Sequence, residues 1–198
     1  MKSLLIALAV MFALIGGASA QISEDKAKKS TETIEKMRQL DLLNQLLPLV
    51  MTKEQIRKLL PSIEKSRADV KTEEGTEADL IAKYAARVDQ AVKDGIQKGD
   101  VPDKKFLVEL NALIRTMSMR RDAIAHDNVD RVLEAMKATL NAGQLKAAAN
   151  SLNPTVFLTG IKVEEMTEDQ KIRLFIQEIM LDPLAYDILV KMQASPIG

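Results

Sequence analysis

The stretch "LVMTKEQIRKLLP", residues 49–61, shows how this chain begins its helices. If Thr52 is the N-cap residue, its hydroxyl can accept a hydrogen bond from the amide of Gln55, and the Gln55 side chain can accept one from the Thr52 amide. Met51 and Ile56 have the spacing of a hydrophobic staple around such a capping box. An apolar run follows, so the stretch predicts the start of an amphipathic helix.

Two other stretches repeat the pattern. "MTEDQKIRLFI", residues 166–176, places Gln170 three residues after Thr167, and "LNAGQLKAAA", from residue 140, places Gln144 three residues after Asn141. A helix cap contributes only about 1 kcal/mol. Helix starts alone therefore explain all three stretches, without any functional role for the repeated residues.

The composition predicts an all-α fold, an elongated helical bundle of about six or seven helices. Good helix formers such as Ala, Leu, Lys, Glu and Gln dominate, Trp is absent and aromatic residues make up 3% of the chain. Apolar spacing and helix caps predict helices at 24–47 before Pro48, 53–71 with a kink or restart at Pro61, 76–97 capped by Thr76, 104–140, 144–150, 168–181 and 183–193.

The breaks between these helices are less uniform. We expect a polar turn at 71–79 around Gly75, a stop at Gly99 with Asp103 capping the next helix, and an irregular connection at 150–165. The pattern leaves open whether 104–140 is one bent helix or two. Asp182 and Pro183 suit the cap and the first turn of the last helix.

Residues 1–20 have the features of a secretory signal. An apolar run of about 13 residues follows Lys2, which is shorter than the roughly 20 residues of a membrane-spanning helix. Ala18-Ser19-Ala20 then predicts cleavage before Gln21. We therefore expect a periplasmic or secreted protein, with a single helical domain at 21–198. The chain has no cysteine, so it has no disulfide.

Charge and residue types exclude several classes of function. Without Lys2 the 28 basic residues become 27, against 28 acidic residues, and this balance argues against a nucleic-acid partner. The only histidine, His126, lies near Asp127 and Asp130, but zinc and copper sites need more nitrogen or sulfur ligands. The pairs Glu73-Glu74 and Glu164-Glu165 are expected in polar turns as solvated charges. We predict no enzyme activity and no cofactor.

The stretch "RTMSMRRD", residues 115–122, is the candidate binding surface. Met117, Met119, Arg120 and Arg121 could together contact apolar client segments, because flexible methionines are common on surfaces that bind many partners. The alternative is that Met117 fills the core and the arginines are solvated, since Met117 continues the apolar row of the predicted helix.

The three repeated words, "MTKEQ", "LNAGQ" and "MTEDQ", resemble the Leu-Thr-x-x-Gln motif of the Spy/CpxP family of periplasmic stress proteins. Met replaces Leu in two of them, and Asn replaces Thr in the third. The resemblance assigns Thr52, Gln55, Thr167 and Gln170 to the motif. It implies helical hairpins in a cradle-shaped dimer that binds unfolded proteins without ATP, although the family's basic cradle does not match this chain's balanced charge.

These features lead to two expectations about function. The first is an exported helical binding protein of the cell envelope, such as an ATP-independent chaperone or stress-response factor, with unfolded or partner proteins as ligands and a homodimer as one arrangement. Its apolar groove would be lined by residues from 24–60 and 104–140, with Met119, Arg120 and Arg121 at the rim. The second is a structural or scaffold protein that acts by self-association or partner binding, without catalysis.

Overall fold

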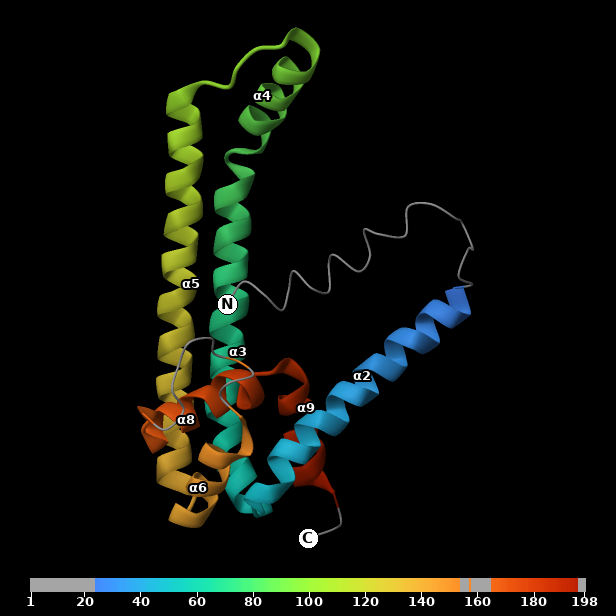
Figure 1. Ribbon diagram of the computed structural model, residues 1–198, viewed down its shortest axis with the longest axis vertical. Helices are drawn as coiled ribbons and strands as arrows, with labels where there is room; N and C mark the ends of the chain where they lie inside the picture. The colour runs from blue at the N-terminus through green and yellow to red at the C-terminus, as the bar shows by residue number, and fades with distance from the viewer. Residues whose placement is uncertain (1–23, 154–156, 158–164, 196–198) are drawn as a thin grey trace. The chain divides into compact units, whose positions relative to one another are not determined.

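The computed structural model describes residues 24–153, 157 and 165–195, and this part of the chain is all-α, as predicted (Figure 1). The described residues form no strand. They form seven α-helices, the 3-10 helix η1 and the π-helix η3, in the order α2 (Glu24–Leu46), η1 (Leu47–Leu49), α3 (Lys53–Ala82), α4 (Ala85–Lys98), α5 (Lys104–Thr139), α6 (Ala142–Ser151), α8 (Glu168–Phe175), η3 (Ile176–Met180) and α9 (Pro183–Ala194). The predicted signal at 1–20, and most of the irregular connection at 150–165, lie outside the described residues.

The chain divides into two compact units, and the boundary falls within α2. The first unit ends at Arg38 and the second begins at Gln39. Ile34 and Met37, on the part of α2 in the first unit, are exposed. Leu42 and Leu46, in the second unit, are buried in the core. Only the C-terminal end of α2 therefore contributes to the core of the second unit.

The second unit is built on an antiparallel hairpin of α3 and α5, which lie side by side (Figure 1). The helix α4 joins their distal ends. At the opposite end, which we call the base, α3 packs against α9, α5 against η3, and α6 against α8. The apolar core lies in this base, and its largest fully buried side chains are Leu46, Leu49, Ile56, Leu59, Ile63, Val132, Met136, Ile172, Phe175, Ile176, Met180 and Leu189.

The predicted polar turn at 71–79 is wrong, because α3 runs without interruption from Lys53 to Ala82. Gly75 lies inside this helix. Thr76 is not a cap, and its hydroxyl donates to the backbone oxygen of Thr72 at 3.0 Å, one turn earlier in the same helix. Pro61 also lies within α3, so the helix does not restart there.

Most of the predicted helix ends are confirmed. The region 104–140, which the sequence left open, is one helix of 36 residues. Asp103 caps it by accepting from the amide of Phe106 at 3.2 Å. Gly99 ends α4 in the left-handed region, with φ 74°, a conformation that glycine adopts without steric cost. Asp182 caps α9 and Pro183 occupies its first turn.

Candidate functional site

All three predicted capping boxes are present. The amide of Gln55 donates to the Thr52 hydroxyl at 3.2 Å, and the Thr52 amide donates to the Gln55 side chain at 3.0 Å. Asn141 with Gln144, and Thr167 with Gln170, make the same two bonds at the starts of α6 and α8. The repeated words are therefore helix starts, as their spacing predicted.

Two of the boxes meet in space, a contact that the sequence did not reveal. The side-chain amide of Gln55 donates to Oε1 of Gln144 at 2.9 Å, and that of Gln144 donates to Oε1 of Gln55 at 3.0 Å. The Gln144 amide also bonds the backbone oxygens of Leu49 at 3.0 Å and Val50 at 3.2 Å. This pair, which we call the glutamine latch, joins the starts of α3 and α6 to η1.

The latch holds a backbone segment in an unusual conformation. Val50 has φ 46°, in the left-handed region that β-branched residues rarely adopt. Its carbonyl oxygen is bound by Gln144 and its amide donates to the oxygen of Leu47 at 3.0 Å. The third box has no bond of this kind to the latch: Gln170 bonds its own cap, Thr167. Four of the six motif residues thus come together, and they join helices of the base.

The "RTMSMRRD" stretch lies on the distal part of α5, where it contributes to the contact with α3. Nε and Nη2 of Arg120 donate to the two carboxylate oxygens of Glu73, at 2.6 and 2.8 Å, and Arg121 makes the same two-pronged contact with Glu77. Glu73 and Glu77 retain only 7% and 6% of their exposure. The expectation that Glu73 is a solvated charge in a turn is therefore wrong.

These contacts shift the pKa values of Glu77, Arg120 and Arg121 so that the charged form of each side chain is favoured. The hydrogen bond from Arg121 lowers the pKa of Glu77 below its ordinary value, and burial opposes this shift. The bonds from Glu73 and Glu77 raise the pKa values of Arg120 and Arg121, respectively. The Arg121–Glu77 pair therefore stays ionised at neutral pH. Of the other two candidates, Met117 is buried and Met119 is exposed.

A polar layer separates the bridges from the apolar base. Arg131 donates to the Ser66 hydroxyl at 3.1 Å and to the Asn128 side chain at 2.7 Å, and it also pairs with Asp69 at 2.9 Å. The Asn128 amide donates to the backbone oxygen of Ser66 at 3.3 Å. Ser66 and Asn128 are buried, so this network supplies the partners that buried polar groups need.

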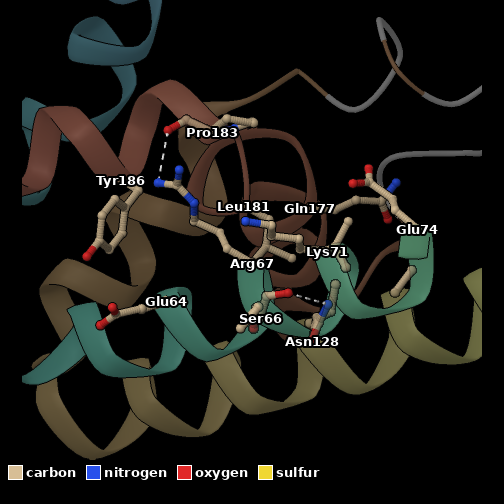
Figure 2. Close-up of a pocket in the computed structure, with 14 residues that line it drawn as sticks. Glu64, Ser66, Arg67, Lys71, Glu74, Asn128, Gln177, Leu181, Pro183 and Tyr186 are labelled. Carbon is tan, nitrogen blue, oxygen red and sulfur yellow. Dashed lines mark hydrogen bonds between the residues drawn. The ribbon is translucent and has the colours of Figure 1, made fainter. Parts of the chain in front are cut away.

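A groove lies on one face of the hairpin beside this layer, and Figure 2 shows the residues that line the first of its two cavities. It consists of a cavity of about 730 Å³ bounded by α3, α5, η3 and α9, and a second of about 390 Å³ between α3 and α5. The two cavities share Val70, Glu74 and Ala125, so they lie next to each other. We call the two together the α3/α5 groove. Its apolar lining comprises Ala68, Val70, Ile124, Ala125, Val129, Leu181 and Pro183.

The end of the groove nearest the base is fixed by contacts between α3 and α9. The Arg67 guanidinium lies 4.4 Å from the centroid of the Tyr186 ring and donates to the backbone oxygen of Pro183 at 3.5 Å (Figure 2). Gln177, from the π-helix η3, lines the same cavity, and π-helical turns are frequent at functional sites. Burial raises the pKa of its neighbour Glu178.

The groove differs from the predicted one in its walls. Residues 64–77 of α3 line it, whereas the prediction placed residues 24–60 there. Arg121 lies in its wall, but Met117, Met119 and Arg120 are not among the lining residues. The sequence did not predict this surface because the expected turn at 71–79 interrupted its α3 wall, which lies within one continuous helix.

The described residues hold no group of three or more His, Cys, Asp or Glu side chains that could bind a metal ion. His126 and Asp127 are exposed on α5, and Asp130 pairs with Arg173 of α8 at 2.5 Å. Within the described part of the chain, no helix has both the length and the apolar character of a membrane span.

The fold and the groove together define a class: an all-α protein whose helical hairpin carries a mixed apolar and charged groove above a latched base. No protein-family model, curated protein or solved structure matches the chain. The resemblance to the Spy/CpxP family stays a prediction from the three motif words.

Proposed function

We propose that the chain is an exported helical binding protein of the cell envelope, which holds apolar segments of other proteins in the α3/α5 groove. The groove is the observation that carries the proposal. Each of its two cavities, of about 730 and 390 Å³, falls in the roughly 300–1,000 Å³ range of ligand sites. Its apolar lining consists of small and medium side chains, a surface that an apolar helix or strand can cover.

The charges around the groove suit weak and varied binding. Glu64, Lys71 and Glu74 place both signs of charge along its α3 wall, so segments of different charge find a partner there. Such binding needs no nucleotide, because burial of apolar surface supplies its driving force. A periplasmic or secreted location, a chaperone or stress-response role and a homodimer belong to the same proposal, and the predicted signal at 1–20 and the motif resemblance support them.

The rival function is a scaffold that acts by assembly alone. The glutamine latch favours it, because the Gln55 and Gln144 side chains bond each other and so serve helix packing. A scaffold would not protect unfolded proteins.

The test is suppression of aggregation of a chemically unfolded client by the exported protein without nucleotide. We expect protection by the wild type and its loss in Ala125→Arg, because Ala125 lines both cavities of the groove. Ala123→Arg is the matched control: Ala123 is also exposed on α5, but lies about 200° away around the helix. No protection by the wild type, or equal loss in both variants, would overturn the proposal and favour the scaffold.

A further inference from the structure

The helix α4 carries an apolar surface that the described residues do not cover. None of its residues is buried, and Val92 and Ile96 are 54% and 79% exposed. With 3.6 residues per turn, these two side chains stand one above the other in a single row. A row of large apolar side chains on a helix indicates a contact surface.

The opposite side of α4 is fixed to α5, so the row points outward. Arg87 pairs with Glu109 at 2.8 Å, and its guanidinium lies 4.3 Å from the centroid of the Phe106 ring. Arg87 is roughly 140–180° around the helix from Val92 and Ile96. The position of α4 on the hairpin therefore presents the apolar row to solvent.

The charges beside the row indicate what covers it. Asp89 and Lys93 are exposed and form a parallel row about 60° around the helix. Neither side chain has a partner among the described residues. When two copies of a helix pack antiparallel about a two-fold axis, each flank faces the same flank of the other copy. With the axis near Ala91 and Val92, Asp89 of each copy lies opposite Lys93 of the other.

We propose that two copies of the chain associate through α4, in an antiparallel pair that buries Val92 and Ile96 and forms two symmetric Asp89–Lys93 ion pairs. The inference specifies the contact of the homodimer in the proposed function, but it does not depend on client binding in the groove. Each α4 helix supplies both Asp89 and Lys93, so the same surface on two copies is complementary to itself. A closed dimer therefore pairs all four charges.

The experiment measures the dimer dissociation constant of the exported protein by sedimentation equilibrium. We expect a concentration-dependent dimer in the wild type, and a monomer in Ile96→Asp. Asp89→Lys and Lys93→Asp alone should each weaken the dimer by at least about tenfold, because like charges then face each other. The double variant Asp89→Lys/Lys93→Asp restores opposite charges and should return the constant to within about threefold of wild type.

Gln97→Asp is the control, since Gln97 is exposed on α4 about 120° from the apolar row. Circular dichroism of each variant separates loss of the dimer from loss of the helix. A wild type that stays monomeric at all concentrations, or a double variant as weak as the single ones, would overturn the inference. Failure of client protection with an intact dimer would overturn only the groove.

Discussion

The base of the α3/α5 hairpin and its distal half use the same helices with the same spacing, but different side chains hold them together. The row of α3 that faces α5 advances by alternating steps of three and four residues. It is apolar at the base, with Ile56, Leu59 and Ile63 buried, and then continues with Ser66, Glu73 and Glu77. At the base, Ile56, Leu59 and Ile63 pack in a core that includes other helices as well as α5. Further out, Arg120 pairs with Glu73 and Arg121 with Glu77.

The difference shows that the two halves of the hairpin have separate roles: the base supplies most of the stability, and the distal ion pairs set the alignment of the two helices. Apolar burial grows with the number of packed neighbours, and α6, α8, η3 and α9 surround only the base. Paired charges contribute less net free energy, because their loss of hydration offsets their attraction. They bind in a fixed geometry, however, and a two-pronged arginine contact sets the register of two helices.

Of the substitutions that test this comparison, Leu59→Ala should cause the largest loss in the free energy of unfolding. Leu59 is fully buried in the base, so the lost apolar contacts and the resulting cavity should cost about 2–5 kcal/mol. Val70→Ala, at the same kind of position in the distal half, should cost less than about 1 kcal/mol because Val70 is 44% exposed. Urea denaturation measures both, and equal costs would contradict the division.

Gln144→Ala tests the latch in the base. The substitution removes partners from the backbone oxygens of Leu49 and Val50 and from Gln55, so we expect a cost of about 2 kcal/mol. Gln170→Ala is the control: it removes a capping-box contact without the latch and should cost about 1 kcal/mol or less. If the two variants have the same stability, the latch contributes nothing beyond the cap.

Arg121→Leu tests the distal half. It leaves the buried Glu77 carboxylate without its partner, at an expected cost of about 1–2 kcal/mol, towards the lower end of the range because Arg121 is largely exposed and solvent screens the pair. The reverse change, Glu77→Leu, should cost less, since the Arg121 side chain can return to water. Thermal unfolding of both variants checks this asymmetry, and a larger cost for Glu77→Leu would refute it.

Acid should produce the smallest effect, also in the distal half. The pKa of Glu77 is lowered in the folded state from its ordinary value of 4.5. Its contribution is therefore complete above that value and is lost as the pH falls through the folded pKa. We expect Glu77→Gln to be less stable than wild type at about pH 6, with the difference shrinking as the pH falls below 4.5. Urea midpoints across this range measure it, and a difference independent of pH would contradict the assignment.

The sequence predicted those features of the fold that depend on a few neighbouring residues. Thr52, Asn141 and Thr167 cap helices because their bonds reach only three residues ahead. Gly99 and Asp182 ended and began helices for equally local reasons.

The failures came from partners far away in the chain. Residues 71–79 contain Gly75 and several polar side chains, which on their own favour a turn. The carboxylates of Glu73 and Glu77 belong to a helix contact only because Arg120 and Arg121, 47 and 44 residues later, pack against them. The same distance concealed the groove and the glutamine latch, since no local pattern pairs α3 with α5 or Gln55 with Gln144.

The ion pairs of the distal half and the glutamine latch of the base also close chain segments of different length. The Glu73–Arg120 bridge spans 47 residues, and it lies inside the 89-residue separation between Gln55 and Gln144. The entropy lost on joining two points rises with the length of free chain between them. An early bridge would shorten the segment that the latch must still close. The distal charges would then act mainly on the folding rate, and the apolar base on the unfolding rate.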